Sequence, residues 1–146
     1  MKKFCVYWLP VLVWAAMISG FSTDSFSGEH TSRFFEPFVR FFWPTISREN
    51  LEFLNHLVRK SAHVTEYMIL SLLLFRALRG GEEIRWKPAW FWICIVSIAV
   101  YAALDEFHQS FVPSRGASFK DVGFDTVGGL VGLGFAWWWS QRAHKA

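Results

Sequence analysis

Apolar residues fall along this chain in four blocks, and each block is long enough to cross a lipid bilayer as a helix. The blocks run from about Phe4 to Phe21, from about Leu57 to Leu78, from Ala89 to about Gln109, and from near Lys120 to Trp137-Trp138-Trp139. A bilayer core about 30 Å thick needs roughly 20 apolar residues in helical form. The pattern therefore predicts an all-α integral membrane bundle of about four transmembrane helices, forming a single domain over residues 1–146.

Local signals indicate where these helices begin and end. Pro88 suits the first turn of a helix, where its missing N–H costs nothing, and Gly80-Gly81 is expected to end the second block. Ser47 is a good N-cap for a helix that continues into the second block as one long helix. The basic start of the chain also suits a signal peptide. However, Met17-Ile18-Ser19-Gly20 is a poor cleavage site, so we expect an uncleaved anchor.

The stretch between the first and second blocks has a mixed character. Ser22 to Ser32 is polar and predicts turns, whereas Phe34 to Trp43 mixes aromatic residues with Glu36, Pro37 and Arg40. Such a mixture is typical of a segment that lies in the headgroup layer of a membrane. We expect either an interfacial or a re-entrant segment here, and the sequence leaves both alternatives open.

The composition agrees with a membrane protein. Hydrophobic residues make up 53% of the chain, and only 18% of residues are charged, against about 25% in a typical globular protein. The net charge of +3 is not gathered into a basic run, so we expect no nucleic-acid partner. Cys5 and Cys94 both lie in apolar blocks, where we expect neither a disulfide nor a metal site.

The distribution of Lys and Arg predicts the orientation. Four spans place both termini on one side, and basic residues are dense in the short flanks on that side. They are Lys2, Lys3, Arg76, Arg79, Arg85, Lys87, Arg142 and Lys145. The opposite side carries its basic residues over a far longer stretch. Because basic flanks stay in the cytoplasm, we expect a multi-pass protein of the inner (cytoplasmic) membrane with both termini cytoplasmic.

Ionisable residues gather near the predicted outward ends of three blocks. The second block opens with Lys60, His63 and Tyr67 on one helix face, the third closes with acidic residues, and the fourth opens with them. These three polar stripes are expected to meet at one depth, facing outward. The predicted ligand-binding cluster comprises Lys60, His63, Glu66, Tyr67, Asp105, Glu106, Gln109, Arg115, Asp121 and Asp125.

A simpler interpretation is that charged side chains near helix ends only reach back to the headgroups. That interpretation is the better one for Arg48, Arg59 and Glu106. It fails for Glu66 and Asp125, which are short acidic side chains inside apolar segments. We also expect His30, His56 and His144 to be plain surface residues.

Two further features of the sequence concern helix packing and metal binding. Gly128 and Gly132 have the spacing of residues that allow two helices to pack closely. His63, His108 and Asp105 could together hold a metal, but they lie on two helices without any recognisable ligand spacing. We therefore expect no metal and no cofactor.

The polar motifs resemble those of the VanZ-like family over about residues 55–135. The matching motifs are Arg59-Lys60-x-x-His63-x-x-Glu66-Tyr67, then Asp105-Glu106-x-x-Gln109-x-Phe111-x-Pro113-x-Arg115, then Asp121 before a glycine-rich helix. The resemblance implies a bacterial membrane protein of about four helices. The namesake is associated with low-level resistance to the glycopeptide teicoplanin. Asp125 departs from the Asn that the resemblance leads us to expect at this position.

Three functions follow from these residues. The first, which we favour, is an accessory protein of the cell envelope in which Lys60, His63 and Arg115 hold an anionic headgroup. Its ligand would be a lipid-linked phosphate or a lipoglycopeptide, alongside membrane lipids as partners. Arg115 is suited to phosphate because its guanidinium forms bidentate pairs.

The other two functions use the acidic residues. An enzyme acting on an envelope lipid would use His63 with Glu66 or Asp105 as the candidate catalytic residues for acid–base chemistry, although no nucleophile motif is present. A proton-coupled transporter would use Asp125, Glu66 and His63 as a relay. Four helices are few for a transporter, so this function would favour a homo-oligomer.

Overall fold

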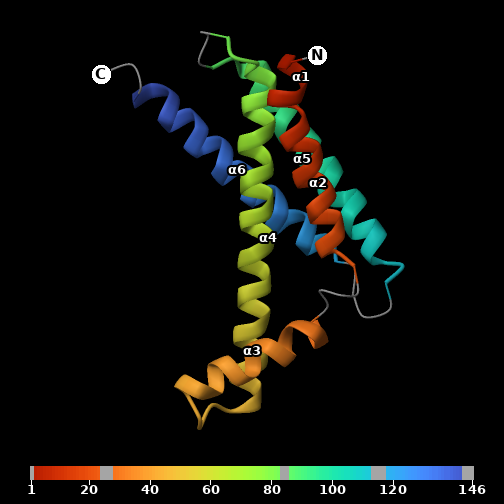
Figure 1. The fold of residues 1–146 in the computed structure, drawn as a ribbon, viewed down its shortest axis with the longest axis vertical. Coiled ribbons are helices and arrows are strands. Elements are labelled where there is room, and N and C mark those ends of the chain that lie inside the picture. The colour runs from red at the N-terminus through yellow and green to blue at the C-terminus, as the bar shows by residue number, and fades with distance from the viewer. Residues whose placement is uncertain (1, 24–27, 83–85, 113–117, 143–146) are drawn as a thin grey trace.

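The computed structural model describes residues 2–23, 28–82, 86–112 and 118–142, without the side chains of residues 28–31 and 34. These parts of the chain form α1 (Lys2–Tyr7), α2 (Leu9–Phe21), α3 (Gly28–Phe42), α4 (Arg48–Arg79), α5 (Pro88–Gln109) and α6 (Phe119–Arg142) (Figure 1). No strand occurs among the described residues. The prediction of an all-α protein is therefore confirmed.

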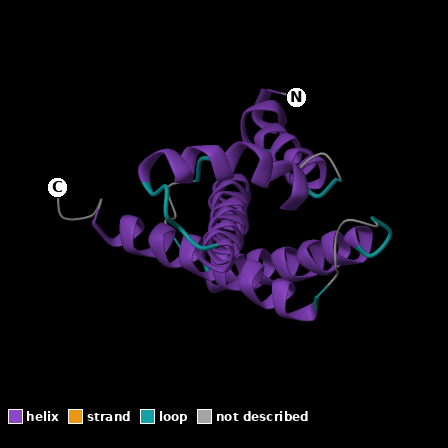
Figure 2. Cartoon of the chain, turned by 90° about the horizontal axis from the view of Figure 1, so that it is seen from below, coloured by secondary structure: helices purple, strands orange, loops and turns teal. Residues whose placement is uncertain are grey.

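The long helix α4 is the axis of the molecule. Helices α2, α5 and α6 lie around its C-terminal half, and α3 lies across its N-terminal end (Figures 1 and 2). Helices α4 and α6 begin at the end of the bundle where α2 and α5 finish, so neighbouring helices alternate in direction along the chain. As a result, the N- and C-termini lie at the same end of the molecule, opposite α3.

The signals for the ends of α4 act as expected. The Ser47 hydroxyl accepts a hydrogen bond of 3.2 Å from the backbone N–H of Asn50, and the helix runs without a break into the second apolar block. Gly80 ends it with a left-handed φ of 56°, a conformation that costs glycine little. The single long helix and its glycine stop are both confirmed.

The first apolar block, predicted as a span from about Phe4 to Phe21, is divided into two helices, α1 and α2. The break falls at Trp8, two residues before Pro10. Pro10 has no N–H to donate to the carbonyl of Val6 one turn earlier. The Arg76 guanidinium donates to that carbonyl instead, at 3.1 Å, so a basic residue of α4 compensates for the break.

The segment between the first two blocks is more helical than predicted. Helix α3 begins at Gly28, inside the stretch expected to form turns, so that expectation is wrong for residues 28–32. Its exposed aromatic side chains continue past the helix end and comprise Phe38, Phe41, Phe42 and Trp43. The helix lies across α4 rather than along it (Figure 1). Its position in a headgroup layer stays a prediction.

One described helix, α5, is long and apolar enough to cross a membrane, and α2 is a shorter apolar helix. Helices α4 and α6 carry ionisable residues such as Glu66 and Asp125 inside their apolar stretches. These residues lower the mean hydropathy of both helices. Four spans therefore remain a prediction rather than a finding.

Helices α4 and α6 pack closely because α6 presents glycines to the backbone of α4. A Cβ atom on Gly128 would collide with the carbonyl of Val64, and one on Gly132 would collide with the carbonyl of Met68 and the hydroxyl of Ser71. All three glycines at 128, 129 and 132 are buried. The predicted close packing through Gly128 and Gly132 is confirmed.

We predict that Gly128→Ala destabilises the protein, because the added methyl group meets backbone that cannot move aside like a side chain. An overpacked contact of this kind costs about 1–3 kcal/mol of unfolding free energy. The matched control is Gly134→Ala, in the same helix, where a Cβ meets nothing within 4 Å. Thermal unfolding in detergent should show a lower Tm for Gly128→Ala and no loss for Gly134→Ala. Equal Tm values would contradict this packing.

Candidate functional site

Polar side chains from three helices meet at the end of the bundle where α4 and α6 approach and α5 finishes. Helix α4 contributes Tyr67 from a fully buried position, α5 contributes Asp105, which is 4% exposed, and α6 contributes Asp125, which is 1% exposed. Charged groups are rarely buried to this degree unless they are paired. The structure therefore brings together residues from all three predicted polar stripes.

Two contacts join α4 to α6 at this site. The Lys60 ammonium forms an ion pair with the Asp121 carboxylate, and both side chains are about one quarter exposed. One turn deeper, His63 Nδ1 lies 3.8 Å from Asp125 Oδ1 and 3.9 Å from Glu66 Oε2. The imidazole is therefore flanked by two carboxylates, at ion-pair range and beyond hydrogen-bond range.

Helix α5 is tied to the end of α2 through Asp105. Its Oδ2 accepts hydrogen bonds from the Ser22 hydroxyl and from the Gln109 amide, each 2.8 Å long. The Gln109 amide also donates to the Ser22 oxygen at 3.3 Å. The sequence did not identify Ser22 as a site residue, since it follows a helix end and stands 83 positions before Asp105.

Glu106 also belongs to the interior and not to the headgroups. It is 5% exposed, and its Oε2 accepts a hydrogen bond of 2.7 Å from the backbone N–H of Ser118, next to the start of α6. Exposed N–H groups at a helix start bind carboxylates well. The interpretation of Glu106 as a side chain that only reaches the headgroups is wrong.

Several buried oxygens of the cluster make no hydrogen bond in the described structure. They are Tyr67 OH, Asp105 Oδ1 and both oxygens of Asp125. A buried polar atom without a partner costs about 1–3 kcal/mol. Such atoms are unusual in proteins and call for an explanation such as an ordered water, an ion or a bound ligand. Carboxylate oxygens accept hydrogen bonds, so the group that suits these positions carries N–H or O–H donors.

The charges around these atoms are mostly negative. The described cluster contains two basic residues, Lys60 and His63, and five carboxylates. The carboxylates are Glu66, Asp105, Glu106, Asp121 and Asp125. Because Lys60 is already paired with Asp121, the site has little free positive charge among the described residues.

Two other predictions concern Arg115 and His108. Arg115 lies outside the described residues. His108 is exposed, and no group of three His, Cys, Asp or Glu side chains in the described part of the chain could hold a metal. The described structure does not gather His63, His108 and Asp105 into a metal-binding group.

Tyr101 lies one turn before Asp105 on α5 and has a different role. Its hydroxyl donates to the carbonyl of Ala15 at 2.6 Å and lies 2.7 Å from the Ser19 hydroxyl. These bonds fix α2 against α5. Because the Tyr101 hydroxyl is used in these bonds, Tyr67 is the tyrosine that belongs to the cluster.

We predict that Asp125→Asn stabilises the protein by about 1–3 kcal/mol, because it removes a buried carboxylate whose oxygens have no hydrogen bond. Asp121→Asn is the matched control and should destabilise, since it leaves Lys60 without its partner. Thermal unfolding of the two variants in detergent measures both effects. A lower Tm for Asp125→Asn would show that its carboxylate is satisfied in the folded protein.

Comparison with known proteins agrees with the polar motifs. The family model described as VanZ/LLP1 matches residues 4–140, nearly the whole chain. No curated protein and no solved structure matches this chain. The match extends beyond the motifs of α4, α5 and α6 to include α1, α2 and α3. This chain belongs to the VanZ/LLP1 family.

Proposed function

We propose that this protein is a multi-pass protein of the bacterial inner membrane that binds a hydroxyl- or amine-bearing envelope ligand in the cluster between α4, α5 and α6. By binding this ligand it contributes to resistance to glycopeptides such as teicoplanin. The observation that carries the proposal is the set of buried oxygens without hydrogen bonds on Tyr67, Asp105 and Asp125. Sugar hydroxyls, amides and amines are the groups that would satisfy them.

The charge of the cluster decides between ligand classes. An anionic group, which the sequence suggested for this site, would meet five carboxylates and a lysine that Asp121 already neutralises. Repulsion between like charges at a few ångströms is strong in a poorly solvated site. A neutral or cationic headgroup rich in donors is the better match. Glycopeptides and amino sugars have this chemistry.

An enzyme is the second candidate, and the position of His63 is the observation that favours it. An imidazole between the carboxylates of Glu66 and Asp125 has the surroundings of a general base. Incubation of the purified protein with an envelope glycolipid distinguishes the two functions. A new product that disappears in His63→Ala would support the enzyme, and an unchanged lipid would support binding.

The arrangement of the helices supports the membrane topology. Both termini lie at one end of the bundle, as an even number of crossings requires (Figure 1). The described basic residues Lys2, Arg79 and Lys87 flank helices at that end. Helix α3 lies across α4 with exposed aromatic side chains, the arrangement that suits a helix resting in the plane of the membrane surface.

We predict that the termini are cytoplasmic and that the cluster opens to the outside. In a chain with Cys5 and Cys94 replaced by Ser and Ala, a cysteine at Ser110 should react with an impermeant maleimide added to whole cells. A cysteine at Glu82 should react only after the cells are opened. Both positions are exposed and lie at opposite ends of the bundle. The reverse labelling would overturn the orientation.

We predict that Tyr67→Phe abolishes most of the resistance that the protein confers. This variant removes one hydroxyl that makes no hydrogen bond within the protein, so the fold should be unaffected. A lost hydrogen bond to a bound ligand weakens binding about tenfold. Teicoplanin susceptibility of cells expressing each variant measures the effect, alongside the amount of protein in the membrane.

Tyr101→Phe is the matched control for that experiment. It removes a hydroxyl of the neighbouring helix that bonds to Ala15 and lies outside the cluster. Resistance per unit of membrane protein should be kept. Full resistance in Tyr67→Phe, with an equal amount of protein, would mean that the ligand does not contact the cluster.

A further inference from the structure

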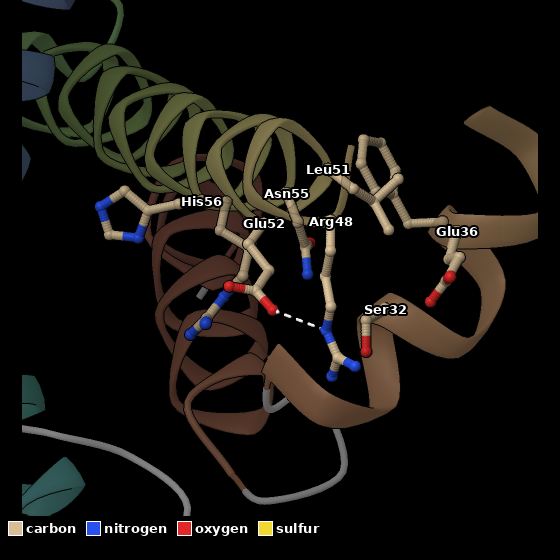
Figure 3. A pocket seen from close by; sticks show the side chains of 9 residues that line it. Ser32, Glu36, Arg48, Leu51, Glu52, Asn55 and His56 are labelled. Carbon is tan, nitrogen blue, oxygen red and sulfur yellow. Dashed lines mark hydrogen bonds and ion pairs between the residues drawn. The ribbon is translucent and has the colours of Figure 1, made fainter. Parts of the chain in front are cut away.

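A second polar pocket lies between α3 and the N-terminal part of α4, away from the buried cluster. It encloses about 290 Å³. Its lining residues are Ser32, Phe35, Glu36, Arg48, Leu51, Glu52, Asn55, His56 and Arg59. Figure 3 shows the side chains of Arg48 and Asn55 reaching from α4 into the space toward α3. His56 is exposed, as expected of a surface residue, and it lines this pocket together with Arg48 and Arg59.

The charges of this pocket leave one guanidinium available. Each of its two carboxylates already has an arginine, since Arg40 Nε lies 2.8 Å from Glu36 and Arg48 Nε lies 3.2 Å from Glu52. No ion pair joins Arg59 to a carboxylate within the described parts of the chain. Arg59 therefore offers a ligand in the pocket a guanidinium that has no carboxylate partner among the described residues.

Two further groups can add hydrogen-bond donors to the pocket. The Arg48–Glu52 pair is highly exposed, at 88% and 70% for the two side chains, and exposed pairs of this kind contribute little to stability. Arg48 can therefore turn its remaining N–H groups to a ligand. Asn55 also lines the pocket, and the N–H groups of its side-chain amide can donate to a bound oxygen.

The pocket and the buried cluster lie along one face of α4. Arg48, Glu52, Arg59, His63 and Glu66 follow one another at spacings of three, four or seven residues, and residues at such spacings share a helix face. The rise from Arg59 to His63 is about 6 Å along the helix axis. A ligand bound at Arg59 would therefore be within one turn of the cluster.

We propose that this pocket binds the phosphate group of a phosphate ester through Arg59, Arg48 and Asn55. The planar guanidinium of Arg59 suits a bidentate contact with two phosphate oxygens. The phosphate belongs either to a lipid headgroup or to a soluble ester, and the pocket chemistry is the same for both. Phosphate binding at the pocket does not depend on the function proposed above. The further step, in which the same ligand reaches the cluster with its donor groups, rests on that function.

Native mass spectrometry of the full chain in detergent tests the proposal. The probes are phosphatidic acid, glycerol phosphate and, as a neutral control, diacylglycerol. Arg59→Ala should weaken the affinity for phosphatidic acid about tenfold. Arg33→Ala is the matched control, because Arg33 is an exposed arginine of α3 outside the pocket, and it should change the affinity less than about twofold. Arg59→Lys should fall between them, since lysine keeps the charge and lacks the fork.

The two sources of phosphate give different results. Binding of phosphatidic acid alone, lost in Arg59→Ala, identifies a lipid headgroup, and equal loss for glycerol phosphate identifies a soluble ester. Equal effects of Arg59→Ala and Arg33→Ala, or binding of diacylglycerol as tight as that of phosphatidic acid, would overturn the pocket as a phosphate site. The measurement compares variants of the pocket alone, so a failure of the function proposed for the cluster would leave this result standing.

Discussion

The close approach of α6 to α4 is the contact on which the candidate site depends. Gly128 and Gly132 let α6 lie against the backbone carbonyls of Val64 and Met68. The two helices run in the same direction, so residues earlier on α6 face residues earlier on α4. Asp125 is thereby placed beside His63, and Asp121 beside Lys60. A side chain at either glycine would push these pairs apart.

This contact also explains why acidic groups are buried where they are. Asp121 can remain near the surface with Lys60, but Asp125 is carried one turn deeper, where only the His63 imidazole is within ion-pair range among the described side chains. Asp105 reaches the same region from α5, with one oxygen held by Ser22 and Gln109 and the other without a hydrogen bond. Because unpaired buried carboxylates are costly, we expect this region to lower the stability of the protein.

Much of the fold follows from local sequence signals. Ser47, Gly80 and Pro88 mark helix ends that the structure confirms, because caps and prolines act on their own neighbours. The helix break at Trp8 was not predicted, since Pro10 sits near the start of an apolar run and the compensating Arg76 is far along the chain. Residues 28–32 were expected to form turns because they are polar and follow other turn formers, yet α3 includes them.

Part of the site could also be predicted from local sequence patterns. Spacing along single helices grouped Lys60 with His63 and Asp121 with Asp125, and the helix directions brought the groups together. No spacing links Ser22 to Asp105 or Ser118 to Glu106, because these bonds depend on how separate helices meet. The excess of negative charge likewise depends on the tertiary structure, because it arises from five carboxylates on three helices. This excess is the reason why the proposed ligand is a donor-bearing group and not an anion.

The most direct test of the donor-binding cluster is native mass spectrometry of the protein extracted gently from bacterial membranes, with no ligand added. The account predicts a retained adduct whose fragments carry hydroxyl or amine groups. It also predicts that an Asp105→Ala, Asp125→Ala double variant, folded and present in equal amount, loses the adduct. Equal retention of the adduct by the double variant would contradict the account, because the ligand would then be held elsewhere.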